Sequence, residues 1–429
     1  MSGRFNPRIY REPAPQAWLI RLLGPVNRHL MLGPVLGLRR FDLPGADLAR
    51  LRAAVNPGTA AFLGPNHPEF LTDWLVDKEI SRRVSPLMAH WASYEIVNGS
   101  PLSQRFWLAN NLIANAPGGE GKAYSVRWAL AGHGVLLHPE GTATWQGERV
   151  GPLLPGVVDM AWEAARLLRE RGDSRPVFVV PLLWRLRFLA DPSAGLSREM
   201  AHIERALGLA PGGGALEARF AALLGRLLAR QCGRLSLPAP AFDPAAPGRA
   251  YFGAQAATLA ALREALARAH GPLEPDPVRA QHQLRKSIRA LAATDPEGAR
   301  RDRERLAELQ RLAGFDPALY DRPTLAPERI AEVLKRTRGA LVTRGFANAL
   351  HNTVPVAVAP RAVHVRVPEP LAVHEALAAG ADAEAGRSAL LAALRERLQH
   401  GLDALGAELA GDAHGPERAN LLWSGGATR

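Results

Sequence analysis

The stretch Ala60-Ala-Phe-Leu-Gly-Pro-Asn-His67-Pro-Glu-Phe-Leu-Thr-Asp73 decides the fold of this chain. It opens with an apolar run of strand length, continues through a polar loop around His67, and then takes on helical periodicity. A strand that runs into a polar loop and then a helix is the repeating unit of α/β domains, in which a rigid sheet positions the residues of the loop.

The same alternation extends over residues 44–190. Short apolar runs end in polar loops, and longer stretches with apolar residues at helical spacing separate them. We expect an α/β domain with a central mixed sheet flanked by helices. Strands are predicted at residues 60–63, 112–115, 135–138 and 177–183, and helices at residues 46–54, 69–83, 121–131 and 157–171.

After this domain the sequence becomes rich in Ala, Leu and Arg and is interrupted by segments rich in Pro and Gly. Residues 191–355 are therefore predicted to form a helical insertion or accessory domain. A strand pattern returns at residues 362–367, and a long helix is predicted at residues 388–409. We assign residues 356–429 to this returning strand and C-terminal helix. Within the insertion, helices are predicted at residues 216–231, 254–269, 277–293 and 296–313.

The composition is that of a globular, basic protein. Of 429 residues, 47% are hydrophobic and 22% charged, and the net charge is +12. This charge suits partners that carry phosphate, although a coding bias toward arginine would produce the same excess. Because no helix-turn-helix or aromatic-rich basic patch is found, nucleic acid is not an expected partner. The single cysteine, Cys232, cannot form an intramolecular disulfide, so a cytoplasmic location is expected.

Residues 1–43 form a basic N-terminal segment. Between residues 16 and 41, apolar side chains such as Trp18, Leu22 and Leu30 are mixed with arginines. Basic amphipathic segments of this kind bind in the headgroup region of membranes, and the alternative is a helical hairpin packed on the domain. Since no apolar run is long enough to span a bilayer, we expect a peripheral protein at the inner face of the cell membrane.

The chemistry is predicted to centre on His67 and Asp73. His67 lies at the end of a strand, and Asp73 lies in the first turns of the helix that follows. A carboxylate that binds one imidazole nitrogen fixes the tautomer and leaves the other nitrogen free to remove a proton. The spacing therefore predicts a general-base dyad.

A second loop at a strand end contains His138-Pro139-Glu140-Gly141-Thr142. No Gly-x-Ser-x-Gly elbow occurs in the chain, and Cys232 has no neighbouring histidine in the sequence. We therefore expect direct group transfer without a covalent enzyme intermediate. No metal site and no cofactor are expected.

With both loops in view, the chain resembles the glycerolipid acyltransferase family, of the lysophosphatidic acid acyltransferase type. That family has Asn-His followed by Asp, then a Pro-Glu-Gly-Thr block, then a strand that ends in Val-Pro, here Val180-Pro181. The resemblance covers residues 45–190 and implies transfer of a fatty acyl group from acyl-CoA or acyl carrier protein to a lipid hydroxyl. In family terms His67 is the base, Asp73 orients it, and Glu140, Gly141 and Thr142 help to hold the acceptor.

Two departures concern the acceptor. Ala143 replaces the basic residue that often follows Glu-Gly-Thr in the family, and His138 stands where phenylalanine is usual. The charge expected for an acceptor phosphate would then come from Lys122, Arg127 or Arg149.

Two functions are alternatives to an acyltransferase. One is a thioester or lipid hydrolase that uses the same dyad, and the other is a basic lipid-binding protein without catalytic activity.

Overall fold

The computed structural model describes residues 9–69, 71–116, 118–343, 345, 358–378, 382–412 and 417–423. The chain divides into two units. The first contains Met1–Leu189 and Asn352–Ala413, and the second contains Ala190–His351 and His414–Arg429.

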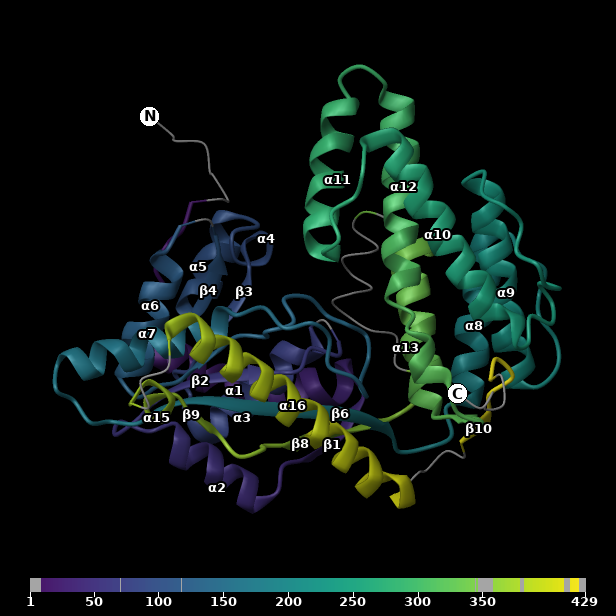
Figure 1. Ribbon diagram of the computed structural model, residues 1–429. Helices are drawn as coiled ribbons and strands as arrows, with labels where there is room; N and C mark the ends of the chain where they lie inside the picture. The colour runs from purple at the N-terminus through teal and green to yellow at the C-terminus, as the bar shows by residue number, and fades with distance from the viewer. Residues whose placement is uncertain are drawn as a thin grey trace. The chain divides into compact units, whose positions relative to one another are not determined.

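A mixed sheet of eight strands forms the centre of the first unit (Figure 1). Its order is β1-β8-β6-β2-β5-β3-β4, and β9 pairs with β6. The five strands from β6 to β4 run parallel, whereas β8 is antiparallel to β6 and parallel to β1. The strands are β1 (Leu38–Asp42), β2 (Ala60–Pro65), β3 (Ala89–Ser93), β4 (Leu112–Asn115), β5 (Val135–Leu136), β6 (Val177–Phe188), β8 (Arg361–Arg366) and β9 (Leu371–Ala372).

Helices cover both faces of this sheet, and β2 is buried along its whole length, as expected for a parallel strand between two helical layers (Figure 1). Ala60 and Phe62 belong to a core with α6, α7 and α16, whereas Ala61 and Leu63 belong to a second core with η1, α2 and α3. The helices are α1 (Ala17–Val26), η1 (Asn27–Val35), α2 (Gly45–Ala54), α3 (Thr72–Val84), α4 (Tyr94–Val97), α5 (Pro101–Ala109), α6 (Glu120–Leu130), α7 (Gly156–Glu170), α15 (Val373–Ala378), α16 (Ala383–Leu409) and η4 (Ala410–Asp412).

The sequence-based prediction of an α/β unit with a mixed sheet flanked by helices is confirmed. Three strands of the sheet were not predicted: β1, an edge strand in the segment predicted to be amphipathic, β3, which lies between β5 and β4, and the two-residue β9. The helix predicted from residue 69 begins instead at Thr72, because the backbone N–H of Glu69 donates to the Asp73 side chain outside the helix.

The second unit is mainly helical. It includes the helices predicted in the insertion together with α8 and α13, which were not predicted. The last described residues, 417–423, were grouped with the returning strand and C-terminal helix, but β10 pairs with β7 of the second unit. The elements are α8 (Ser193–Leu207), α9 (Leu216–Arg234), α10 (Ala250–His270), α11 (Pro277–Leu291), α12 (Pro296–Ala313), η2 (Pro317–Tyr320), β7 (Thr324–Leu325), α13 (Pro327–Thr337), η3 (Arg338–Val342) and β10 (Arg418–Ala419).

The basic N-terminal segment folds as α1 and η1 on the first unit, where Ile20, Asn27 and Leu32 are buried. Within the described residues, no helix combines the length and apolar character needed to cross a membrane.

Candidate active site

The loop after β2 is fixed to the sheet by Asn66. Its side-chain oxygen accepts a hydrogen bond from the Trp184 N–H at 2.9 Å, and its side-chain amide donates to the Trp184 carbonyl oxygen at 3.1 Å. The Asn66 N–H also donates to the Leu182 carbonyl oxygen, so Asn66 continues the pairing of β2 with β6. His67 therefore leaves the sheet from a rigid position.

The backbone of His67 is held by the loop that follows β5. Its N–H donates to Glu140 Oε1 at 2.8 Å, and its carbonyl oxygen accepts from the Thr144 N–H at 2.8 Å. The second oxygen of Glu140 accepts the N–H of Gly151 at 2.8 Å. The two loops that the sequence singled out are thus joined through one buried carboxylate.

Asp73, in the first turn of α3, is hydrogen-bonded through Oδ2 to Nδ1 of His67. Burial, and then the neighbouring Asp77 and Glu69, raise the pKa of Asp73 well above its usual range. When Asp73 is ionised its carboxylate only accepts hydrogen bonds, so the proton lies on Nδ1 of His67 and the lone pair lies on Nε2. No described residue hydrogen-bonds to this Nε2. The predicted dyad is therefore assembled with the geometry of a general base.

A second His–Asp pair lies against the first. The rings of His67 and His138 are stacked, with centroids 4.2 Å apart and planes inclined by 20°. His138 Nε2 is 2.9 Å from Asp77 Oδ2, and Nδ1 is 3.1 Å from the carbonyl oxygen of Asn66. Both ring nitrogens of His138 are therefore engaged by groups of the protein.

A third histidine extends the series. His90 Nε2 is 2.9 Å from the hydroxyl of Ser81. Asp73, Asp77 and Ser81 of α3 therefore each form a hydrogen bond with one histidine. These positions are four residues apart and lie on one face of the helix. Neither Asp77 nor Ser81 was among the predicted site residues, although this spacing from Asp73 was visible in the sequence.

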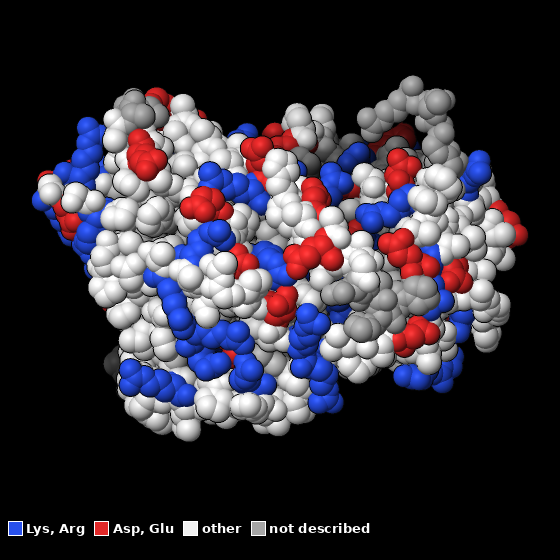
Figure 2. Space-filling view, turned by 90° about the horizontal axis from the view of Figure 1, so that it is seen from below, with Lys and Arg blue, Asp and Glu red and all other residues white. Residues whose placement is uncertain are grey.

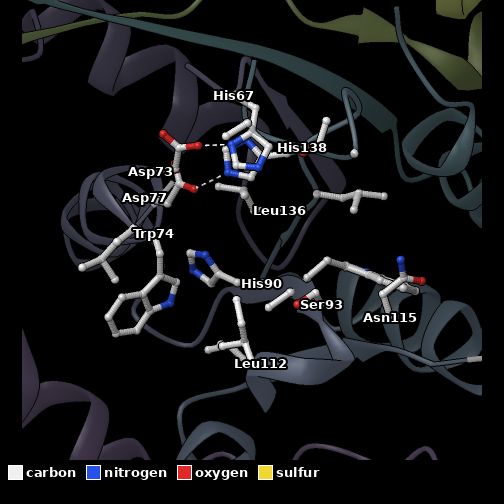
Figure 3. Close-up of a pocket in the computed structure, with 18 of the residues that line it drawn as sticks. His67, Asp73, Trp74, Asp77, His90, Ser93, Leu112, Asn115, Leu136 and His138 are labelled. Atoms are coloured by element: carbon white, nitrogen blue, oxygen red, sulfur yellow. Dashed lines mark hydrogen bonds and ion pairs between the residues drawn. The ribbon is translucent and has the colours of Figure 1, made fainter. Parts of the chain in front are cut away.

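The three histidines line a cavity of about 410 Å³ at the carboxyl ends of the parallel strands (Figure 3). Among the described residues that line it there is no lysine or arginine. Figure 3 shows His67 and His138 at one end, with His90 and Trp74 farther along the cavity. The rest of the wall is mainly apolar and includes Leu71, Ile96, Trp107, Leu112, Leu136 and Leu137.

The other predicted site residues divide into two groups. Gly141 and Thr142 line the cavity beside the dyad, whereas both oxygens of Glu140 accept hydrogen bonds from the backbone. Gly141 has a φ of +72°, and a Cβ atom there would lie 2.7 Å from Leu154, so this turn requires glycine. A role of Glu140 in binding the acceptor stays a prediction, and the geometry adds a role in positioning His67.

The predicted cations lie elsewhere. On α6, Lys122 is 3.7 Å from Asp159 and Arg127 is 2.7 Å from Glu12. Neither these two residues nor Arg149 is among the described residues that line the cavity. The structure does not bring them together with the dyad.

Burial controls the charge of the histidines. Burial, and then the neighbouring His138, lower the pKa of His67 well below its usual range. Burial, followed by the charges of Lys78 and His138, likewise lowers the pKa of His90. Both rings are therefore neutral near neutral pH, which His67 requires in order to accept a proton.

His67, Asp73 and His138 also have ligand atoms within 4.8 Å of one another, a spacing that a metal ion can bridge. However, His67 Nδ1 binds Asp73 and His138 Nε2 binds Asp77. Metal binding through these nitrogens would have to break one of the pairs.

A comparison with models of known protein families and a search of curated protein sequences both gave no match.

Proposed function

We propose that the protein is an O-acyltransferase that moves a fatty acyl group from an acyl thioester to a hydroxyl of a glycerolipid acceptor. The observation that carries this proposal is the dyad: His67, oriented by Asp73, has a free Nε2 at one end of a largely apolar cavity. Acyl-CoA or acyl carrier protein is the proposed donor, and lysophosphatidic acid is the first acceptor to test.

In the proposed reaction, His67 Nε2 takes the proton of the acceptor hydroxyl as its oxygen attacks the thioester carbonyl carbon. The new C–O bond forms, the C–S bond breaks, and the thiolate takes the proton back from His67, so atoms and charge balance. Asp73 stabilises the transient imidazolium. Thr142 and Ala143 line the cavity, and their N–H groups donate no hydrogen bond within the described residues, so they are suited to bind the developing oxyanion.

The cavity supports a lipid as the group transferred. Its volume of about 410 Å³ lies in the usual range for ligand sites, and its wall is mainly hydrophobic. Because no lysine or arginine is among its described lining residues, we assign it to the acyl chain and place the acceptor headgroup outside it.

The test is acyl transfer from hexadecanoyl-CoA to lysophosphatidic acid by purified protein. We expect His67→Ala to lower the rate by about 10²- to 10⁴-fold, as for loss of a general base. His270→Ala is the matched control, because His270 forms a His–Asp pair with Asp302 in the second unit, outside the cavity. A folded His67→Ala protein with the wild-type rate would contradict the proposal, and CoA release that is independent of acceptor would indicate a hydrolase.

The same function requires contact with lipid, and the surface of α1 and η1 supports it. Trp18, Leu22, Val26 and Leu30 recur at every fourth residue and are 66%, 60%, 41% and 54% exposed. Four exposed apolar side chains on one face are typical of a helix that lies in a membrane interface.

Positive charge accompanies this stripe. Arg28 of η1 and Arg82 and Arg83 of α3 all bind the buried carboxylate of Glu79, which leaves an excess of two positive charges. Arg52 of α2 donates to the carbonyl oxygen of Arg83, so the cluster continues onto that helix. Figure 2 shows a band of Lys and Arg side chains at the lower left of the face seen from below. We propose that this surface binds the anionic inner face of the cell membrane.

Vesicle flotation tests this surface. Trp18→Ser with Leu22→Ser is expected to reduce binding to vesicles that contain phosphatidylglycerol, and Arg28→Gln with Arg82→Gln should remove the salt-sensitive part of the binding. Leu102→Ser is the matched control, because Leu102 is an exposed apolar residue on α5. Equal binding by all variants would contradict this attachment.

A further inference from the structure

The cavity reaches both faces of the sheet at the carboxyl ends of β3 and β4. Successive side chains of a strand point to opposite faces. In β3, His90 is bonded to Ser81 of α3, whereas the next residue, Trp91, donates to the Ser125 hydroxyl of α6 at 2.9 Å. Both His90 and Trp91 line the cavity. The cavity therefore has one part on the α3 face, with the dyad, and a second part on the α6 face.

Two polar residues lie in the second part. Ser93 follows Trp91 by two residues, and Asn115 follows Ile113, which packs in the core with α6, by two residues, so both are on the α6 face. They are the last residues of β3 and β4 and are direct partners in the parallel pairing, so their backbones are about 4.8 Å apart. Both are exposed, and both line the cavity. One ligand can therefore contact both side chains.

The polar groups of this pair are available to a ligand. Ser93 stands at the N-cap position of α4, where serine commonly accepts a helix N–H, yet its side chain makes no such hydrogen bond. Within the described part of the chain, neither Ser93 nor Asn115 forms a side-chain hydrogen bond. The hydroxyl and the carboxamide each donate and accept. Since no lysine or arginine is among the described lining residues, the pair suits a neutral ligand with amide groups better than a phosphate.

The strand register gives the separation of this pair from the dyad. Leu63, Leu136 and His90 form one row across β2, β5 and β3. His67 is four residues beyond Leu63, and Ser93 is three residues beyond His90, so the two residues lie at nearly the same height at the carboxyl edge. Because β5 lies between β2 and β3, two strand spacings separate them. Ser93 is therefore about 10 Å from His67 along this edge.

We propose that Ser93 and Asn115 bind the pantetheine arm of the acyl donor. This inference rests on the proposed function, in which the thioester lies at His67. The arm is common to acyl-CoA and acyl carrier protein, it is neutral up to its phosphate, and its second amide lies about 8 Å from the sulfur in an extended chain. Figure 3 shows Ser93 and Asn115 on the other side of His90 from Trp74. The arm then leaves along the α6 face, and the acyl chain occupies the apolar part on the α3 face.

The test compares three donors with the same dodecanoyl chain and the same acceptor. They are the thioesters of ethanethiol, N-acetylcysteamine and pantetheine, which carry none, the first and both of the amides of the arm. For the wild-type protein we expect kcat/KM to be about 10-fold or more higher for the pantetheine thioester than for the ethanethiol thioester, because each hydrogen bond between neutral groups contributes about 3- to 10-fold. Equal kcat/KM for the three donors would overturn the proposal.

Two variants test the assignment independently, so that a folding defect in one of them does not end the test. Ser93→Ala and Asn115→Leu should each lower kcat/KM for the pantetheine thioester by about 3- to 10-fold and leave the ethanethiol thioester within about two-fold of the wild type. Trp107→Phe is the matched control, because Trp107 lines the cavity and packs edge-on against Trp74, on the α3 face. It should change kcat/KM for all three donors by a similar factor. Unchanged donor ratios in Ser93→Ala and Asn115→Leu, with an altered preference among acceptor lipids, would overturn the proposal and assign the pair to the acceptor.

A binding measurement separates this inference from the proposed function. Calorimetric titration with S-dodecylpantetheine, a thioether without the carbonyl group, reports recognition of the arm without turnover. If the wild type transfers no acyl group from any donor, but both variants bind the thioether about 3- to 10-fold more weakly than the wild type, the acyltransferase proposal fails and the arm site stands. If transfer proceeds and the variants keep the wild-type donor ratios and affinity, only the arm site fails.

Discussion

The imidazole rings of His67 and His138 are stacked 4.2 Å apart, and each binds an aspartate of α3 at positions one turn apart. Both nitrogens of His138 are hydrogen-bonded, so this ring offers no free atom to a substrate. It acts through His67 instead, because its ring is stacked on the ring of the proposed base. His138 is therefore a positioning residue that also disfavours protonation of His67.

Replacement of His138 by phenylalanine is expected to change the pH dependence of the reaction. Burial, and then His138, lower the pKa of His67, and activity requires the neutral ring. Phenylalanine removes the electrostatic effect by which His138 lowers the pKa of His67, whereas burial remains, so the pKa of His67 rises. The acid limb of the profile of kcat/KM against pH should therefore move to higher pH. At alkaline pH the profile should still reach a plateau, because neutral His67 remains as the general base.

His270→Phe is the matched control for this measurement, because it removes a buried His–Asp pair from the second unit and leaves the site intact. The acid limb of kcat/KM for His270→Phe should lie at the same pH as that of the wild type. An acid limb of His138→Phe that coincides with that of the wild type, or lies at lower pH, would contradict the role assigned to His138.

The strands that could be predicted from the sequence are those with a clear local pattern of apolar residues. Strand β2 and the first three residues of β4 are continuous apolar runs, and both strands were predicted at nearly the observed bounds. In β3, by contrast, the sequence Ala89-His-Trp-Ala-Ser93 has no continuous aliphatic run, and His90 and Trp91 line the cavity and form hydrogen bonds with Ser81 and Ser125. A strand whose side chains serve a site loses the pattern by which strands are recognised.

The site was predictable in the same partial sense. His67 and Asp73 are close in sequence and separated by one loop, so their meeting follows from local geometry. His90 and His138 reach α3 only through the order of the strands in the sheet, with β5 between β2 and β3. No local pattern contains that order. The spacing of Asp73, Asp77 and Ser81 indicated a polar face on α3 but not its histidine partners.

Glu140→Gln is expected to lower both stability and turnover. The carboxylate accepts the N–H of His67 with one oxygen and the N–H of Gly151 with the other. Glutamine would place an amide donor against one of these N–H groups, at a cost of about 1–3 kcal/mol in the free energy of unfolding. The rate should fall because His67 loses its fixed position. The rate of product formation reports turnover, and urea unfolding reports the free energy of unfolding. Wild-type values in both measurements would contradict this positioning role.

Arg361→Leu is expected to destabilise the first unit through Glu69. Arg361 Nη1 donates to Glu69 Oε1 at 2.8 Å, and both side chains are largely buried. Removal of one partner leaves a buried charge unpaired, which costs about 3–5 kcal/mol. Because Glu69 also bonds Thr72 and Asp73, acyl transfer should fall as well. Hydrogen exchange of the α3 amides is the measurement, and the double variant Glu69→Leu with Arg361→Leu should recover part of the lost protection.

The carboxylate of Glu79 is expected to make the first unit sensitive to acid. Burial alone would raise the pKa of Glu79, but the hydrogen bonds from Arg82, Arg83 and Arg28 outweigh it and lower the pKa from 4.5 to about 2. A carboxyl group with a lowered pKa in the folded state stabilises that state above its unfolded pKa. This stability is lost as the pH falls from about 4.5 toward 2. The pKa shift of Glu79 corresponds to about 3 kcal/mol in the free energy of unfolding. We expect about half of this contribution, because the exposed parts of the arginines are screened by solvent.

Glu79→Gln should therefore speed hydrogen exchange of the α3 amides at neutral pH, and the difference from the wild type should shrink in acid, where the wild-type carboxyl group becomes protonated. Glu163→Gln is the matched control, because Glu163 forms a similar but exposed pair with Arg166. A difference between Glu79→Gln and the wild type that stays constant down to pH 3 would contradict the assignment, since only a titrating carboxylate produces a difference that disappears with protonation.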